Sequence, residues 1–191
     1  MNDGLKKLGR SLEEQFFKKR DAELIEQRKQ LEQMERTRED LAEISGIRNP
    51  KVLDKFIELE ISPSILASLA ILPLVEVAWA DGKLDEKEKK AILAGAANSG
   101  ISKGSVDYAL LDGWLKQRPP SELLEAWIHY IAGLCEIMSR NEIDALRLEL
   151  LMRAKKVAEA AGGFLGITSK ISAEEQIIFK KMESAFSSSP N

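Results

Sequence analysis

The stretch Trp79-Ala80-Asp81-Gly82-Lys83-Leu84-Asp85-Glu86-Lys87-Glu88 predicts a sharp turn between two helices. The apolar run 65–80 stops abruptly at Asp81-Gly82, and a polar segment typical of a helix start follows at Asp85. Glycine accepts the positive φ that such a tight turn requires. The pattern therefore predicts a helix, an acidic turn and a second helix. Nothing in the chain alternates with period two over a useful length, so we expect an all-α protein without a sheet.

The composition is that of a charged helical protein. Its 191 residues are 44% apolar and 31% charged with a net charge of −3, so no overall positive field attracts nucleic acid. One cysteine and one histidine exclude a disulfide framework and a multi-histidine metal site. The first residues lack the apolar core of a signal peptide. The most apolar window, 65–80, is short for a membrane span and contains Pro73 and Glu76. We therefore expect a cytoplasmic protein without a transmembrane segment.

Residues 1–45 predict a charged N-terminal helical arm, because helix breakers are almost absent after Gly9. Its apolar stripe is too narrow to form a core of its own. The arm is therefore expected to lie on the main domain, to bind a protein partner or to self-associate. An alternative, in which it contacts a membrane surface, rests on apolar residues that stand beside basic ones, namely Leu5, Leu8, Leu12, Phe16 and Phe17 beside Lys6, Lys7 and Arg10.

Residues 46–186 predict one helical domain, and residues 187–191 a disordered tail. Asn49-Pro50 and Ser62-Pro63 are helix-start signals, since proline is favoured in the first turn. Pro73 lies inside the apolar helix and predicts a kink or a break near Leu72. Further helices are expected at about 86–98, 105–116, 122–139, 141–161 and 173–186.

The segment Leu165–Ile177 repeats the acidic turn in outline. Aligned with Ala78–Lys90, it places Ile171 opposite Leu84, and an apolar or small-residue helix precedes each turn. This similarity suggests two related helix–turn–helix units that face each other across one core. It predicts that Leu84 and Ile171 are both buried in equivalent places.

The apolar helix that ends in Ala-Asp-Gly before an acidic helix start resembles the TerB-like family of tellurite-resistance helical proteins. Here the motif spans Val75 to Glu88, and the resemblance covers roughly residues 63–186. It implies an all-α bundle with a non-enzymatic role in metal or chemical stress. It also implies that acidic turn residues bind a metal ion, which on this chain are Asp81, Asp85 and Glu88. The second turn carries Thr168 and Ser172 in place of such acids.

The same turn also fits a helix cap without any metal, and we favour this interpretation. Asp85 and Glu88 have the spacing of a capping box, and Ser172 and Glu175 repeat that spacing in the second turn. If a cation binds, a carboxylate ligand set favours calcium, magnesium or manganese over zinc. Glu76 would then be a fourth ligand, although an exposed helix face is its simpler interpretation. The alternative function is a structural interaction or oligomerisation module without a metal.

The remaining residues of chemical interest point to packing. The turn does not fit an EF-hand: with Asp81 at the fifth position of the calcium loop, Val77 and Trp79 would occupy the first and third positions, which must ligate calcium. No nucleophile motif accompanies His129, so we expect it to be half-buried and predict that the protein is not an enzyme. Cys135 is expected in the core. The tryptophans are also expected there, whereas an exposed Trp79 beside the turn would indicate a binding pocket.

Overall fold

A computed structural model describes residues 3–16, 26, 29, 37–84, 86–98, 101, 103, 106–164 and 171–187. Within these ranges every regular element is an α-helix, so the predicted all-α fold is confirmed. The helices are α1 (Asp3–Phe16), α3 (Arg38–Ser45), α4 (Pro50–Glu58), α5 (Pro63–Ala78), α6 (Glu86–Asn98), α7 (Val106–Lys116), α8 (Glu122–Cys135), α9 (Arg140–Phe164) and α10 (Ala173–Ala185).

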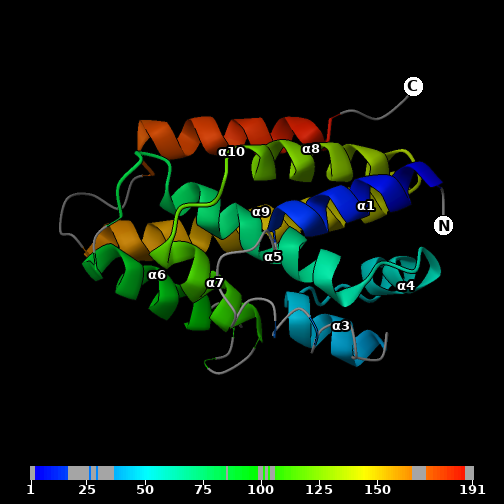
Figure 1. Cartoon of the computed structure of the whole chain (residues 1–191), viewed down its shortest axis with the longest axis horizontal. Helices are drawn as coiled ribbons and strands as arrows, with labels where there is room; N and C mark the ends of the chain where they lie inside the picture. Colours follow the sequence, from blue (N-terminus) through cyan, green and yellow to red (C-terminus); the bar gives the residue numbers. More distant parts are fainter. Residues whose placement is uncertain are drawn as a thin grey trace.

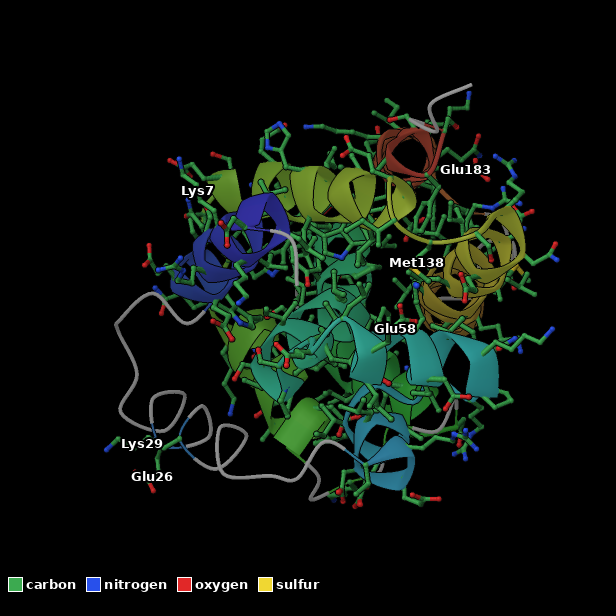
Figure 2. All side chains as sticks on the ribbon, turned by 90° about the vertical axis from the view of Figure 1, so that its right-hand side faces the viewer. Lys7, Glu26, Lys29, Glu58, Met138 and Glu183 are labelled. Carbon is green, nitrogen blue, oxygen red and sulfur yellow. The ribbon has the colours of Figure 1, made fainter. Side chains whose placement is uncertain are left out.

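The apolar helix α5 is the centre of the bundle. All of its 16 residues are buried except Glu76 and Ala78. It contacts α1, α3, α7, α8, α9 and α10. Figure 1 shows α8 and α10 along one side of α5, with α3, α4, α6 and α7 along the other. In Figure 2 the surrounding helices form a ring whose charged side chains, Lys7 and Glu183 among them, lie on the outside.

Helix α5 begins at the position that the Ser62-Pro63 signal predicts, and it does not break at Pro73. The hydroxyl of Ser62 accepts the N–H of Ile65 at 3.2 Å and so caps the helix start. The helix continues through Pro73 without the break that was one of two outcomes expected near Leu72. Its buried surroundings support this continuity. None of the helices in the described ranges has both the length and the apolarity needed to cross a bilayer.

The predicted N-terminal arm contributes to the common core. Leu5 and Leu12 of α1 are buried, at 3% and 0% exposure, and α1 lies against α8 and α5. At Gly9 a Cβ atom would come within 2.7 Å of Ile65 Cδ1, so the missing side chain allows the close approach of α1 and α5. Leu41 of α3 is also buried. The expected boundary after residue 45 therefore does not coincide with a gap in packing, while 17–25 and 30–36 lie outside the described residues.

A buried arginine joins α9 to the end of α3. Arg153 is 8% exposed, and its guanidinium donates hydrogen bonds to the carbonyl oxygens of Ser45 and Gly46. Gly46 caps α3 with φ +63°, and any side chain there would collide with this guanidinium. Because a helix leaves its last carbonyls without intrahelical partners, Arg153 satisfies groups that would otherwise be buried and unpaired.

The second predicted turn is described only at its end. The Ser172–Glu175 capping box is confirmed: the Ser172 hydroxyl accepts the Glu175 N–H at 3.1 Å, and the Glu175 carboxylate accepts the Ser172 N–H at 2.6 Å. Leu84 and Ile171 are half-buried, so the prediction that both are buried is wrong. Residues 165–170 lie outside the described part of the chain, and the two-unit repeat remains a prediction.

Candidate functional site

The acidic turn between α5 and α6 is closed by Asp81 itself. Its carboxylate accepts the N–H of Lys83 at 2.9 Å, and the N–H of Gly82 donates to the carbonyl of Trp79 at 2.9 Å. Gly82 has φ +79°, the left-handed conformation expected for it. This is an Asx-type turn, so Asp81 has a structural task that does not require a metal.

The predicted metal ligands have different surroundings. Asp81 is exposed, Glu88 is half-buried in the first turn of α6, and Asp85 lies outside the described residues. Glu76 is half-buried near the end of α5. Among the described residues, no group of three or more His, Cys, Asp or Glu side chains is placed to hold a metal ion. Metal binding at Asp81, Asp85 and Glu88 stays a prediction.

A cleft of about 400 Å³ lies beside the turn, between the end of α5, the α7–α8 loop, α8 and α10. Its volume is within the range of small-molecule sites. It is lined by Glu76, Trp79, Arg118, Pro119, Ser121, Glu122, Leu124, Glu125 and Lys181. Trp79 is half-buried, whereas Trp114 and Trp127 are in the core. Trp79 is therefore neither fully in the core, as expected, nor exposed, as the pocket alternative required; it packs against the core and also lines the cleft.

Trp79 and Arg118 lie on either side of the Asp-Gly turn in the wall of the cleft. The indole N–H of Trp79 donates to the carbonyl of Trp114 at 3.0 Å, which sets the orientation of the ring. The exposed Arg118 side chain lies against the other side of the turn, because a Cβ atom on Gly82 would be 3.4 Å from Arg118 Nη1. The Asp-Gly turn thus lies at one side of the cleft, with an aromatic ring and a guanidinium next to it.

Glu76 is a half-buried carboxylate inside this cleft. It forms no hydrogen bond or ion pair with any described residue. Burial raises its pKa above the ordinary value, and the positive charges of Arg118 and Lys181 oppose that rise. The expectation of an exposed helix face is therefore wrong, since packing of the α7–α8 loop and α10 around the end of α5 removes Glu76 from most of its water.

Lys181 and Glu125 already form an ion pair across the cleft, with Nζ 2.5 Å from Oε1. The hydrogen bond from Lys181 lowers the pKa of Glu125. Their side chains are 45% and 53% exposed, so the pair contributes about 0–1 kcal/mol to stability. Its effect on the cleft is electrostatic, because it neutralises one cation and one anion and leaves Glu76, Glu122 and Arg118 as the other charged groups among the described lining residues.

His129, Tyr130 and Cys135 do not assemble into one site. His129 is exposed rather than half-buried as expected, while Tyr130 is fully buried, and neither lines the cleft. Cys135 is buried as predicted, and burial raises the pKa of its thiol to about 11. A thiol that remains protonated at neutral pH is a poor nucleophile. The absence of an enzymatic activity remains a prediction.

A second depression, of about 330 Å³, lies between α9 and the segment that joins α3 to α4. It is lined by Gly46, Arg48, Asn98, Leu148, Glu149, Met152, Arg153 and Lys156. We call this surface the α9 groove. Leu148 and Met152 are 61% and 41% exposed, one helical turn apart. Sequence reasoning missed this surface because it depends on how α9 lies against α3 and α6, for which the sequence contains no local signal.

Comparison with protein-family models, with curated proteins and with solved structures finds no match to this chain. The TerB-like resemblance therefore rests on the Ala-Asp-Gly motif and the helical pattern around it.

Proposed function

We propose that the protein is a non-enzymatic helical module that binds another protein through the α9 groove. The observation that carries this proposal is the exposure of Leu148 and Met152 at i,i+4 on the rim of the groove. Single exposed apolar side chains are ordinary on a protein surface. Two on one face, beside a depression, form the kind of surface into which a partner helix places its apolar anchors.

Charge selects the class of partner. The groove is lined by the exposed cations Arg48 and Lys156, by the buried Arg153, and by one acid, Glu149. The chain as a whole carries a net charge of −3, so this surface is a local reversal of sign. Complementarity then favours an amphipathic partner segment that carries both apolar and acidic residues.

The α9 groove replaces the arm as the proposed contact. Action through protein partners was predicted from the apolar stripe of residues 1–45. Leu5 and Leu12 from that stripe are covered by α8 and α5 of the same chain, so neither is free to contact a second protein. The exposed pair on α9 is not covered in this way.

The test uses two synthetic amphipathic peptides with the same leucine face, one with glutamates and the other with lysines on the polar face. Nuclear magnetic resonance of the labelled full chain should show shifts confined to the α9 groove with the acidic peptide alone. Leu148→Ser should weaken this binding. Ile177→Ser is the matched control, because Ile177 is 65% exposed on α10 and does not line the groove.

Two results would overturn the proposal. One is equal binding of both peptides, or equal weakening by Leu148→Ser and Ile177→Ser. The other is a dimer of the free protein, seen by sedimentation, that Leu148→Ser dissociates, since the groove would then serve a second copy of the chain.

The resemblance to TerB-like proteins supports a second candidate function, a stress-response accessory protein that binds calcium, magnesium or manganese at Asp81, Asp85 and Glu88. The exposure of Asp81 at the turn leaves its carboxylate accessible to a cation. Titration calorimetry with each metal chloride should give heat that the double variant Asp81→Asn, Asp85→Ser abolishes. An absence of heat up to millimolar metal would remove this candidate.

A further inference from the structure

The cleft beside the acidic turn carries charges of both signs outside the Lys181–Glu125 pair, and Glu76 and Arg118 attract each other there without a direct hydrogen bond among the described residues. Glu76 is half-buried and has no hydrogen bond or ion pair to a described residue, and the same holds for Arg118, which is exposed at the mouth. Lys181 pairs with Glu125, and Glu122 accepts the hydroxyl of Ser121 at 3.2 Å but keeps its negative charge. The cleft is therefore not uniformly acidic or basic.

This arrangement restricts the ligand. A purely cationic ligand would pair with Glu76 but would place a like charge near Arg118. A purely anionic ligand would pair with Arg118 and would bring a second negative charge toward Glu76. A ligand with an ammonium and a carboxylate close together meets both requirements.

We propose that the cleft binds a free α-amino acid with an apolar side chain. The ammonium lies inside, beside the half-buried Glu76 carboxylate, which accepts no hydrogen bond from a described residue. The carboxylate lies at the mouth, where Arg118 can donate two parallel hydrogen bonds. Trp79, Leu124 and Pro119 supply the apolar wall against which the side chain packs.

The proposal is independent of the α9 groove, which lies on a different part of the surface with no shared residue. The proposal also gives a role to the half-buried carboxylate of Glu76, whose burial does not stabilise the fold. Burial raises the pKa of Glu76, so the ionised carboxylate is unfavourable in the empty cleft, and a bound ammonium would relieve that cost.

The experiment is calorimetric titration of the full chain with three probes of matched shape. These are L-leucine, L-leucine methyl ester, which lacks the carboxylate, and 4-methylpentanoic acid, which lacks the ammonium. We expect saturable binding of L-leucine alone. Glu76→Gln and Arg118→Gln should each raise the Kd by about tenfold or more, because each replaces a charge-assisted hydrogen bond with a weaker neutral one.

The matched control is Glu136→Gln, which removes an exposed carboxylate at the end of α8, outside both the cleft and the α9 groove, and should leave the Kd unchanged. Melting curves of all variants establish that they are folded. Binding of the ester as tight as that of L-leucine would overturn the proposal in favour of a simple cation site, and equal binding of the acid would do so in favour of an anion site. The proposal also fails if L-leucine does not saturate, or if neither cleft variant changes its Kd.

Discussion

Replacing Arg153 with methionine removes the charged link between α9 and the end of α3. Methionine retains an unbranched apolar stem but donates no hydrogen bond. The carbonyls of Ser45 and Gly46 then remain buried without the guanidinium. Each unsatisfied group costs about 1–3 kcal/mol. Burial lowers the pKa of Arg153, which means that its charge is itself unfavourable, and its removal offsets part of the loss.

We therefore expect the free energy of unfolding to fall by about 2–3 kcal/mol. For a chain of this length that corresponds to a melting temperature lower by about 4–12 °C. Urea denaturation followed by far-UV circular dichroism at neutral pH measures the change directly, and an unchanged m-value would show that the two states are otherwise the same.

Arg147→Met is the matched control on the same helix. Arg147 is 43% exposed and pairs with Glu183 at 3.3 Å, so its loss should cost about 0–1 kcal/mol. Arg153→Lys should be intermediate, because an ammonium keeps the charge but cannot reach both carbonyls with a planar fork. A loss at Arg153 no larger than that at Arg147 would refute the argument that these two buried hydrogen bonds stabilise the fold.

Glu76→Gln should stabilise the protein at neutral pH, because burial raises the pKa of Glu76 and its ionisation opposes folding. This advantage should shrink as the pH falls through the raised pKa, and melting curves at neutral and acidic pH would detect it. Gly9→Ala should be less stable than Gly4→Ala on the exposed part of α1, because both gain helix propensity and only Gly9→Ala has to displace the Ile65 Cδ1 methyl group; urea denaturation measures the difference. Ser172→Ala should cost about 1 kcal/mol and lower the melting temperature, since it removes the cap of α10. An unchanged melt would contradict that cap.

Features set by neighbouring residues could be predicted from the sequence. The caps at Ser62 and Ser172 and the Asp81-Gly82 turn depend on hydrogen bonds across two or three residues, so their spacing is visible in the chain. The end of α8 was predicted too late, at Ser139 instead of Cys135. A local signal was present there, because Ser139 and Glu142 have cap spacing and the Glu142 carboxylate accepts the Ser139 N–H at 2.7 Å.

The docking of α1 depends on contacts between distant segments. Its apolar stripe shows that some surface must cover Leu5 and Leu12, but it does not show which one. The answer depends on Gly9, whose missing side chain lets α1 approach Ile65. A glycine inside a helical pattern is a weak sequence signal, since it is equally consistent with a helix end.

The cleft was only partly visible in the sequence. An exposed Trp79 beside the acidic turn was predicted to indicate a pocket. In the structure Trp79 is half-buried and lines the cleft. Glu76 was assigned to an exposed face because its burial comes from the α7–α8 loop and from α10, which are distant in the chain. The charge of Arg118 becomes meaningful only once the fold places it against Gly82.

The central position of α5 determines the order in which the chain can be shielded during synthesis. Ribosomes deliver the N-terminus first, so this helix emerges before α7, α8, α9 and α10, which cover much of its surface. Until they arrive, α1 and α3 are the elements made early enough to shelter it. A nascent chain stalled at this stage exposes the apolar surface of a 16-residue helix, which makes it prone to aggregation.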